Sequence, residues 1–272
     1  MKLNFLNVQF LPFYITWDNI DRAKLMHTVL LRNNPDIVCL CEAFDNNATN
    51  IIRQNLKNAG LRYQYYTGLQ GGLFIASKRT ILNSTFVQFN SYGCGFDILG
   101  RKGFLVVQLE SCYIIVLHGQ AGDAKKSINI RKDQILEVET YIQCYLAHVK
   151  LPILIVGDFN TDIMSATKLF RKQNKWLLPH LRTQQHNIIT SFSKSNPLVD
   201  RTEPYIDNKY KHMILDWGIT LASNPVTQFT MTVSETKGTS LILIRRGLFW
   251  FGKMVYTQFL SDHNIVHLAF HT

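Results

Sequence analysis

The sequence predicts an α/β fold in which two packed β-sheets are covered by helices. Segments with apolar residues at helical spacing alternate along the chain with short apolar runs that are typical of buried strands. The strands fall into two strand-rich halves, as a pair of packed sheets requires. The 272 residues contain no Pro/Gly/Ser-rich linker and no internal repeat, so we expect one domain over residues 1–272.

Four segments are expected to be helical because their apolar residues recur at helical spacing. Asp18 or Asn19 is a suitable N-cap for the first helix, and Gly60 follows the second, where a glycine commonly ends a helix. The four helices are expected at residues 20–33, 48–59, about 128–147 and about 165–174.

The strands are predicted from apolar runs that are too short for buried helices. In chain order these runs lie at residues 3–6, 36–41, 61–67, 72–77, 104–109, 113–117, 151–156 and 254–260. Cys39 and Cys41 fall on one strand with their side chains on the same face, so we expect both in the core.

Several of these strands end in a residue that can bind a metal ion or move a proton. An Asp beside an Asn, and an Asp beside a His, offer hard oxygen ligands for Mg²⁺ and a group that titrates near neutral pH. Asp, Asn and Ser also form turns and helix caps, which is the alternative interpretation of each motif alone. Glu42 favours the metal-site interpretation over turns and caps, because a carboxylate at the end of a buried strand costs free energy unless it is exposed, paired or metal-bound. The candidates are Asn7, Glu42, His118, Asp158, Asn160, Asp216, Asp262 and His263.

The order of these motifs resembles the endonuclease/exonuclease/phosphatase superfamily, whose fold is a four-layered α/β sandwich of the deoxyribonuclease I type. The resemblance extends from residue 3 to residue 270. Members of this superfamily cut DNA, RNA, inositol phosphates or phospholipids, so the resemblance alone does not fix the substrate.

Further segments resemble the bacterial sphingomyelinases and their neutral sphingomyelinase relatives. The most specific is Glu-x-Phe-Asp-Asn-x-Ala at residues 42–48, supported by the segments at 7–12, 19–23, 71–78, 93–97 and 102–104. The resemblance implies a Mg²⁺-dependent phosphodiesterase that hydrolyses sphingomyelin to ceramide and phosphocholine at a membrane surface. The expected partner is sphingomyelin or another choline phospholipid, with no nucleic acid, and a monomer is the family default.

The same resemblance implies a role for each candidate residue. Glu42 would bind Mg²⁺, with Mn²⁺ or Co²⁺ as substitutes, and Asn7 would complete or orient the metal site. His263 would act as general base, oriented by a carboxylate such as Asp158. His118 and Asn160 would donate hydrogen bonds to the phosphate oxygens. Asp262 would orient His118, and Asp216 would support the site from behind.

Residues 241–256 predict a β-hairpin with an aromatic tip. Phe249, Trp250 and Phe251 are consecutive, so they cannot all face one side of a strand. The segment resembles the hairpin by which bacterial sphingomyelinases bind membranes, and aromatic rings beside arginines suit the bilayer interface. The alternative is an ordinary core strand.

The formal net charge of +10 indicates attraction to nucleic acid or to an anionic membrane surface, although it also serves solubility. Adjacent basic residues occur as pairs dispersed along the chain and not as one long run, which favours a broad positive surface field over an arm that reads nucleic acid. Two other functions therefore stay open. The first is a metal-dependent nuclease or phosphoinositide phosphatase of the same superfamily. The second is a non-catalytic membrane-binding module. The presence of all the candidate acids and of both candidate histidines argues against this second function.

Five scattered cysteines indicate free thiols in a reducing compartment. The apolar runs are too short to cross a bilayer, and the N-terminus has no signal-type apolar core. We therefore expect a protein that is cytoplasmic, or exported without a visible signal peptide, and bound to the membrane surface when active.

Overall fold

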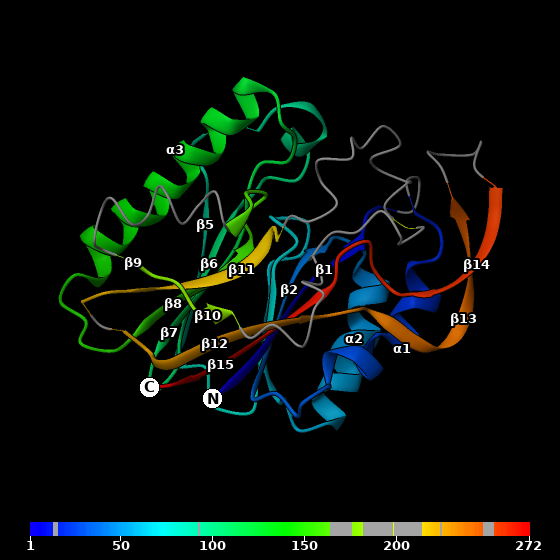
Figure 1. Ribbon diagram of the computed structural model, residues 1–272, viewed down its shortest axis with the longest axis horizontal. Coiled ribbons are helices and arrows are strands. Elements are labelled where there is room, and N and C mark those ends of the chain that lie inside the picture. The colour runs from blue at the N-terminus through cyan, green and yellow to red at the C-terminus, as the bar shows by residue number, and fades with distance from the viewer. Residues whose placement is uncertain are drawn as a thin grey trace.

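Two mixed β-sheets pack against each other at the centre of the protein (Figure 1). The computed structural model describes residues 1–12, 16–91, 93–163, 176–181, 198, 214–223, 225–246 and 253–272. The predicted α/β class with two packed sheets and covering helices is confirmed.

Within the described residues, the first sheet contains seven strands and the second contains six. In spatial order, the first comprises β10 (His180–Leu181), β12 (Thr227–Ser234), β15 (Ile265–His271), β1 (Lys2–Phe10), β2 (Ile37–Ala43), β4 (Phe74–Ser77) and β3 (Tyr63–Tyr66). The second comprises β5 (Asn83–Gln88), β6 (Gly103–Gln108), β7 (Tyr113–His118), β8 (Ile153–Asp158), β11 (Asp216–Leu221) and β9 (Trp176–Leu177).

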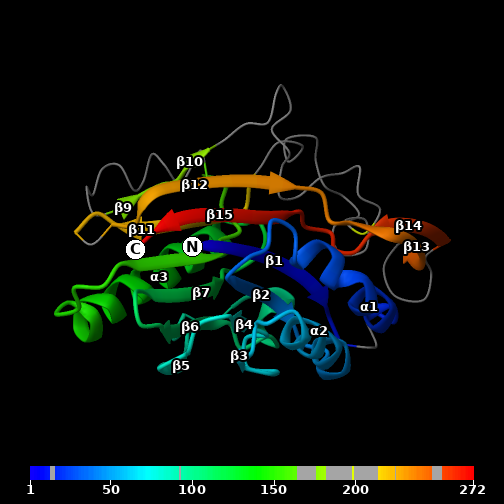
Figure 2. The same cartoon turned by 90° about the horizontal axis from the view of Figure 1, so that it is seen from below.

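Helices cover the outer faces of the two sheets, as Figure 2 shows. On the first sheet lie α1 (Asn19–Leu30) and α2 (Asn46–Asn58), and on the second lies α3 (Lys125–Tyr141), which continues as a π-helical turn over Ile142–Leu146. A short 3-10 turn, η1 (Gly95–Ile98), precedes β6. None of the described helices has the length and hydropathy needed to cross a membrane.

Successive side chains of a strand point to opposite faces of the first sheet, and the apolar side chains on each face are covered by a different layer. Cys39 and Cys41 of β2 pack between the sheets, while Val38 and Leu40 face the cluster built with α1 and α2. Both cysteines are buried free thiols, which confirms the expected core position.

Most predicted elements are present with shifted ends. The strand β1 continues through Asn7 to Phe10, because Val8 and Phe10 are also buried, so Asn7 lies inside the strand and not at its end as we expected. The predicted helix at residues 165–174 lies outside the described residues.

The predicted hairpin is present as a separate two-stranded sheet of β13 (Lys237–Arg246) and β14 (Lys253–Phe259). Its antiparallel register places Leu243 opposite Tyr256. The two strands lie beside α1 at one end of the molecule (Figure 1). Its expected tip, Phe249, Trp250 and Phe251, lies outside the described residues.

Candidate active site

Strand topology brings the candidate residues to one edge of the two packed sheets. β1 runs parallel to β2, and β7 runs parallel to β8, so Asn7, Glu42, His118 and Asp158 all lie toward the carboxyl ends of their strands. β11 runs antiparallel to β8 and places Asp216 directly opposite Asp158. β15 runs antiparallel to β1, which brings the preceding Ser261–His263 segment beside the same end of β1.

An asparagine joins the two carboxylates at the centre of the site. Nδ2 of Asn7 donates hydrogen bonds to Oε1 of Glu42 at 3.0 Å and to Oδ2 of Asp158 at 3.1 Å. Oδ1 of Asn7 accepts the backbone N–H of Gln9. In this arrangement the amide nitrogen of Asn7 orients the two carboxylates, and its Oδ1 keeps a second lone pair beyond the one that accepts the Gln9 N–H.

The donor set at this point fits a divalent cation. Ligand atoms of Glu42, His118 and Asp158 lie within 4.8 Å of one another, and those of Asp158, Asp216 and His263 form a second such group. Burial, followed by the negative charge of Asp262, raises the pKa of Glu42 to about 7. A carboxylate whose ionisation is opposed in this way is stabilised by a nearby positive charge, and carboxylate oxygens suit Mg²⁺.

His263 is held by Asp216. The Nδ1 atom of His263 lies 2.6 Å from Oδ2 of Asp216, whereas Asp158 lies 3.9 Å from Nε2. Burial alone would lower the pKa of His263, but the charges of Asp216, Asp262 and Asp158 raise it well above its usual range. A carboxylate therefore holds His263 as we expected, but it is Asp216 and not Asp158, because β11 places Asp216 closer to the ring.

His118 is paired with a buried lysine. Nζ of Lys102 lies 3.0 Å from Nε2 of His118, and it also donates to the carbonyl oxygen of Gly119 and pairs with Asp97 at 2.8 Å. Burial, then the positive charge of Lys102, lowers the pKa of His118 well below its usual range. The imidazole is therefore neutral near pH 7 and lies beside the Lys102 ammonium group.

Asp262 does not lie where we expected it. We expected it to orient His118, but its Oδ2 accepts a hydrogen bond from Nε2 of Gln9 at 2.8 Å, and its Oδ1 accepts one from the Ser261 hydroxyl. Across the part of the chain that the structure describes, Nδ1 of His118 has no hydrogen-bond partner. The Ser261–His263 segment is hydrogen-bonded to β1, and this directs Asp262 toward Gln9.

Asn160 fixes the turn after β8. Its backbone N–H donates to Oδ1 of Asp158 at 2.8 Å, and its side-chain Nδ2 donates to the carbonyl oxygen of Gly119 at 3.2 Å. Gly119 is required here, because a Cβ atom at this position would lie 2.9 Å from the carbonyl oxygen of Phe159. The turns after β7 and β8 therefore meet at Gly119.

Left-handed backbone conformations cluster at this edge. Gln9, Glu42 and Asn160 have φ values of 50°, 53° and 50°. Such conformations cost free energy for residues other than glycine and persist where the surroundings impose them, often at functional sites.

Arg22 of α1 ties together the two segments that carry Asn7 and Asp262. Its guanidinium donates to the carbonyl oxygens of Val8, Gln9 and Leu260 and pairs with the buried Asp18 at 3.1 Å. Arg22 is itself fully buried. It thereby fixes β1 against the turn before β15.

Lys102, Asp97, Gln9 and Arg22 are therefore site residues to which sequence reasoning assigned no role. All four belong to segments that carried the family resemblance, so the resemblance marked these regions but not the contacts. Lys102 is only 6% exposed, and a buried lysine indicates a special role. Its burial can be seen in the structure but not in the sequence.

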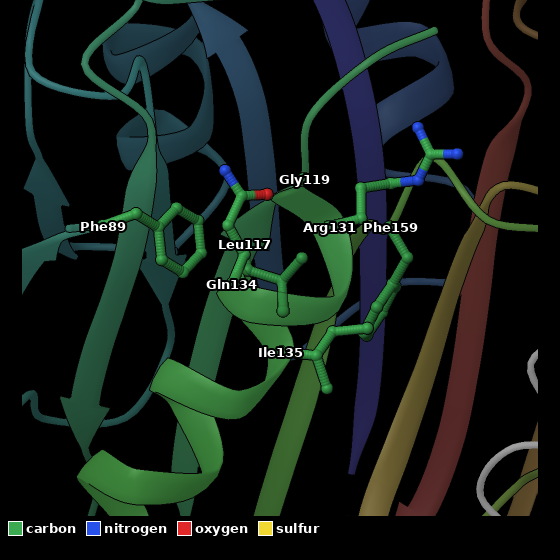
Figure 3. Close-up of a pocket in the computed structure, with 7 residues that line it drawn as sticks. All are labelled: Phe89, Leu117, Gly119, Arg131, Gln134, Ile135 and Phe159. Atoms are coloured by element: carbon green, nitrogen blue, oxygen red, sulfur yellow. The ribbon is translucent and has the colours of Figure 1, made fainter. Parts of the chain in front are cut away.

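A small cavity, shown in Figure 3, is lined by residues next to the site residues and not by Glu42, His118 or Asp158. Leu117 and Phe159, the neighbours of His118 and Asp158, line it together with Arg131 and Gln134 of α3. Arg131 donates to the carbonyl oxygen of Gln120, and Oε1 of Gln134 accepts the N–H of Gln120. These contacts hold the segment that follows His118.

Known proteins resemble this chain in sequence. The sequence pattern of the endonuclease/exonuclease/phosphatase family matches residues 6–263. Sphingomyelinase C of Bacillus cereus is 28% identical over 180 residues, which cover 56% of this chain and 54% of that protein. Phospholipase C of Staphylococcus aureus is 28% identical over 193 residues, which cover 60% of this chain and 57% of that protein. The chain thus spans little more than half the length of these relatives.

Solved structures share the fold over the whole chain. Sphingomyelinase C from Streptomyces griseocarneus has a TM-score of 0.83 at 19% identity and covers 100% of this chain and 99% of its own. A β-toxin variant from Staphylococcus aureus with bound magnesium ions has a TM-score of 0.80 at 22% identity, with the same coverage.

Proposed function

The chain belongs to the endonuclease/exonuclease/phosphatase family, and from this premise we propose that it is a Mg²⁺-dependent phosphodiesterase that hydrolyses sphingomyelin to ceramide and phosphocholine at a membrane surface. One observation carries the proposal. The carboxylates of Glu42 and Asp158 lie between two histidines. One, His263, is hydrogen-bonded to the carboxylate of Asp216, and the other, His118, is hydrogen-bonded to Lys102. The names of the similar proteins favour sphingomyelin among the substrates of the family.

Glu42 and Asp158 would hold the cation, while the amide of Asn7 keeps their oxygens in place. When bound, the cation polarises the phosphate and stabilises the charge that develops on the leaving alkoxide. The hard oxygen donors favour Mg²⁺, with Mn²⁺ or Co²⁺ as substitutes.

His263 would be the general base. Its Nδ1–H donates to Asp216, so Nε2 is the atom that accepts the proton of the attacking water. Asp216 then stabilises the imidazolium that forms, as the carboxylate does in other acid–histidine pairs. Because the pKa of the resting histidine is raised, His263 must first lose its own proton, so activity rises with pH.

His118, Lys102 and Asn160 would act on the phosphate oxygens. Lys102 supplies a fixed positive charge close to the acid cluster, and the neutral His118 beside it supplies a hydrogen-bonding group. Donors that are already in position when charge develops lower the barrier most effectively. Asp262 would act through Gln9 and Ser261 by holding the end of β1 against the turn that carries His263.

The proposal places the enzyme on a membrane, as a monomer with a lipid substrate. Phe249, Trp250 and Phe251, which follow β13 and precede β14 in the sequence, would enter the interface, with rings at headgroup depth. The basic net charge of +10 would add attraction to anionic lipids. The protein would thus be peripheral to the membrane when it is active.

The test compares three substrates with one preparation of enzyme. Phosphocholine release from sphingomyelin vesicles, phosphate release from phosphoinositide vesicles and cleavage of plasmid DNA are each measured with Mg²⁺ and with EDTA. We expect release of phosphocholine that needs Mg²⁺ and is lost in Glu42→Gln. Cleavage of DNA or of phosphoinositide without phosphocholine release would establish the alternative nuclease or phosphatase function and reject the proposal.

A calorimetric titration of Mg²⁺ gives a second readout for Glu42. The Glu42→Gln variant should lose most of the Mg²⁺ binding of the wild-type protein. Asp21→Asn is the matched control, since Asp21 is an exposed acid that pairs with Lys24 on α1.

A further inference from the structure

Two adjoining loops expose large aliphatic side chains near the site. Leu69 lies between β3 and β4 and is 62% exposed, while Ile98 and Leu99 at the end of η1 are 59% and 73% exposed. The backbone N–H of Gly71 donates to the carbonyl oxygen of Gly100 at 3.0 Å, so the two loops are in contact. We call Leu69, Ile98 and Leu99 the apolar lip.

The inner side of the same turn belongs to the active site. Asp97, which immediately precedes Ile98, pairs with Lys102 at 2.8 Å, and Lys102 contacts His118. The carboxylate of Asp97 also accepts the backbone N–H of Ala121, a few residues before α3. In Figure 1 the η1 turn is drawn in teal, near the start of α3. One short turn therefore carries a charged contact of the site on one side and aliphatic side chains in water on the other.

The surroundings of the apolar lip indicate what it binds. Single exposed aliphatic residues are normal on a protein surface, but these are grouped on contacting loops. Arg101 is exposed and lies two residues after Leu99. Aliphatic side chains beside a guanidinium suit a lipid interface, where the former enter the acyl boundary and the latter contacts headgroup phosphates. The charge of the chain, +10, is complementary to an anionic surface.

We propose that the apolar lip docks on the lipid surface that contains the substrate and forms a membrane contact distinct from the hairpin tip. This inference rests on the proposed function, because the occupant it names is the bilayer that carries the phosphodiester. Docking through Ile98 and Leu99 brings the lipid surface to the short turn that also carries Asp97, whose partner Lys102 contacts His118.

The test measures binding without turnover. The double variant Ile98→Ser with Leu99→Ser is made in a His263→Ala background and sedimented with vesicles of sphingomyelin and phosphatidylserine. We expect the partition coefficient to fall roughly tenfold, because two aliphatic anchors are lost. The matched control is Leu82→Ser, since Leu82 is 53% exposed but lies before β5, at the opposite end of the second sheet.

Circular dichroism and the thermal midpoint show whether each variant is folded, and a less drastic Leu99→Ala variant should give a smaller fall in binding. Vesicle binding equal to that of the Leu82→Ser control overturns the inference, as does failure of the parent protein to bind these vesicles at all. Unchanged vesicle binding with a loss of self-association in sedimentation velocity would assign the lip to a second copy of the chain instead. Binding that needs the lip in a protein that releases no phosphocholine would reject the proposed reaction and leave the lip in place.

Discussion

His263 and His267 lie on the same C-terminal segment and are both buried, yet their environments are opposite. His263 contacts the carboxylate of Asp216 at 2.6 Å, and its pKa is raised. His267 contacts only neutral groups among its described hydrogen-bond partners, Asn4 and Ser234, each at 2.7 Å, and burial, then the charge of Arg32, lowers its pKa to about 4. Burial alone therefore does not decide what a histidine does, and the charge of its partner does.

The hydrogen bonds of Asn4 show why His267 stays neutral. Nδ2 of Asn4 donates to the carbonyl oxygens of Leu30 and Arg32, so its Oδ1 must accept from Nδ1–H of His267. Nε2 of His267 is then left to accept the hydroxyl of Ser234. This histidine fastens β15 to β1 and β12, whereas His263 is placed to exchange a proton.

The first prediction removes the charge that distinguishes the two histidines. Asp216→Asn keeps the shape of the side chain but should lower the turnover of sphingomyelin by about 10²- to 10⁴-fold. Because the Asp216 charge raises the pKa of His263, its loss should also move the acid limb of the pH–rate profile to lower pH. Initial rates of phosphocholine release between pH 5 and 9 measure both effects, with Asp21→Asn as the control. A wild-type rate in Asp216→Asn would contradict the assignment.

The second prediction concerns stability and His267. Its pKa is about 4 in the folded protein and about 6.5 in an unfolded chain, so between these values the unfolded state binds more protons. Stability should therefore fall by about 3 kcal/mol as the pH drops from about 6.5 to about 4.

Urea denaturation at a series of pH values measures this loss, and His267→Gln should flatten that part of the curve. His271→Gln is the control, because His271 is exposed on the same strand. An unchanged pH dependence in His267→Gln would show that other groups cause the loss.

The third prediction gives His267 the kind of partner that His263 has. Asn4→Asp places a carboxylate against Nδ1 of His267 and should raise its pKa by about 1 to 2 units. A ¹H–¹³C NMR titration of the histidine rings measures the shift. No upward shift would mean that burial outweighs the charge of the partner and would break the comparison.

The fourth prediction concerns His118, whose partner is a cation. Lys102→Met should raise the pKa of His118, because the Lys102 charge adds to burial in lowering it. Loss of the charge should also slow turnover by roughly tenfold or more. Lys24→Met on the surface of α1 is the control. Equal rates for Lys102→Met and the control would remove Lys102 from the site.

The comparison also shows what the sequence could and could not predict. Strands that end in Glu42, His118 and Asp158 were predictable, because apolar runs followed by polar residues are local patterns. The pairing of His263 with Asp216 was not, because it depends on β11 lying antiparallel beside β8, a contact between distant segments. Lys102 and Gln9 were missed for the same reason, since their partners lie on other strands.

The most direct test of the account is phosphocholine release from sphingomyelin vesicles by the wild-type protein and by His263→Ala, each with Mg²⁺ and with EDTA. His267→Gln serves as the buried-histidine control, assayed near pH 7. We predict release that requires both Mg²⁺ and His263 and that persists in His267→Gln. Release by His263→Ala at the wild-type rate, or none by the folded wild-type protein with Mg²⁺, would contradict it.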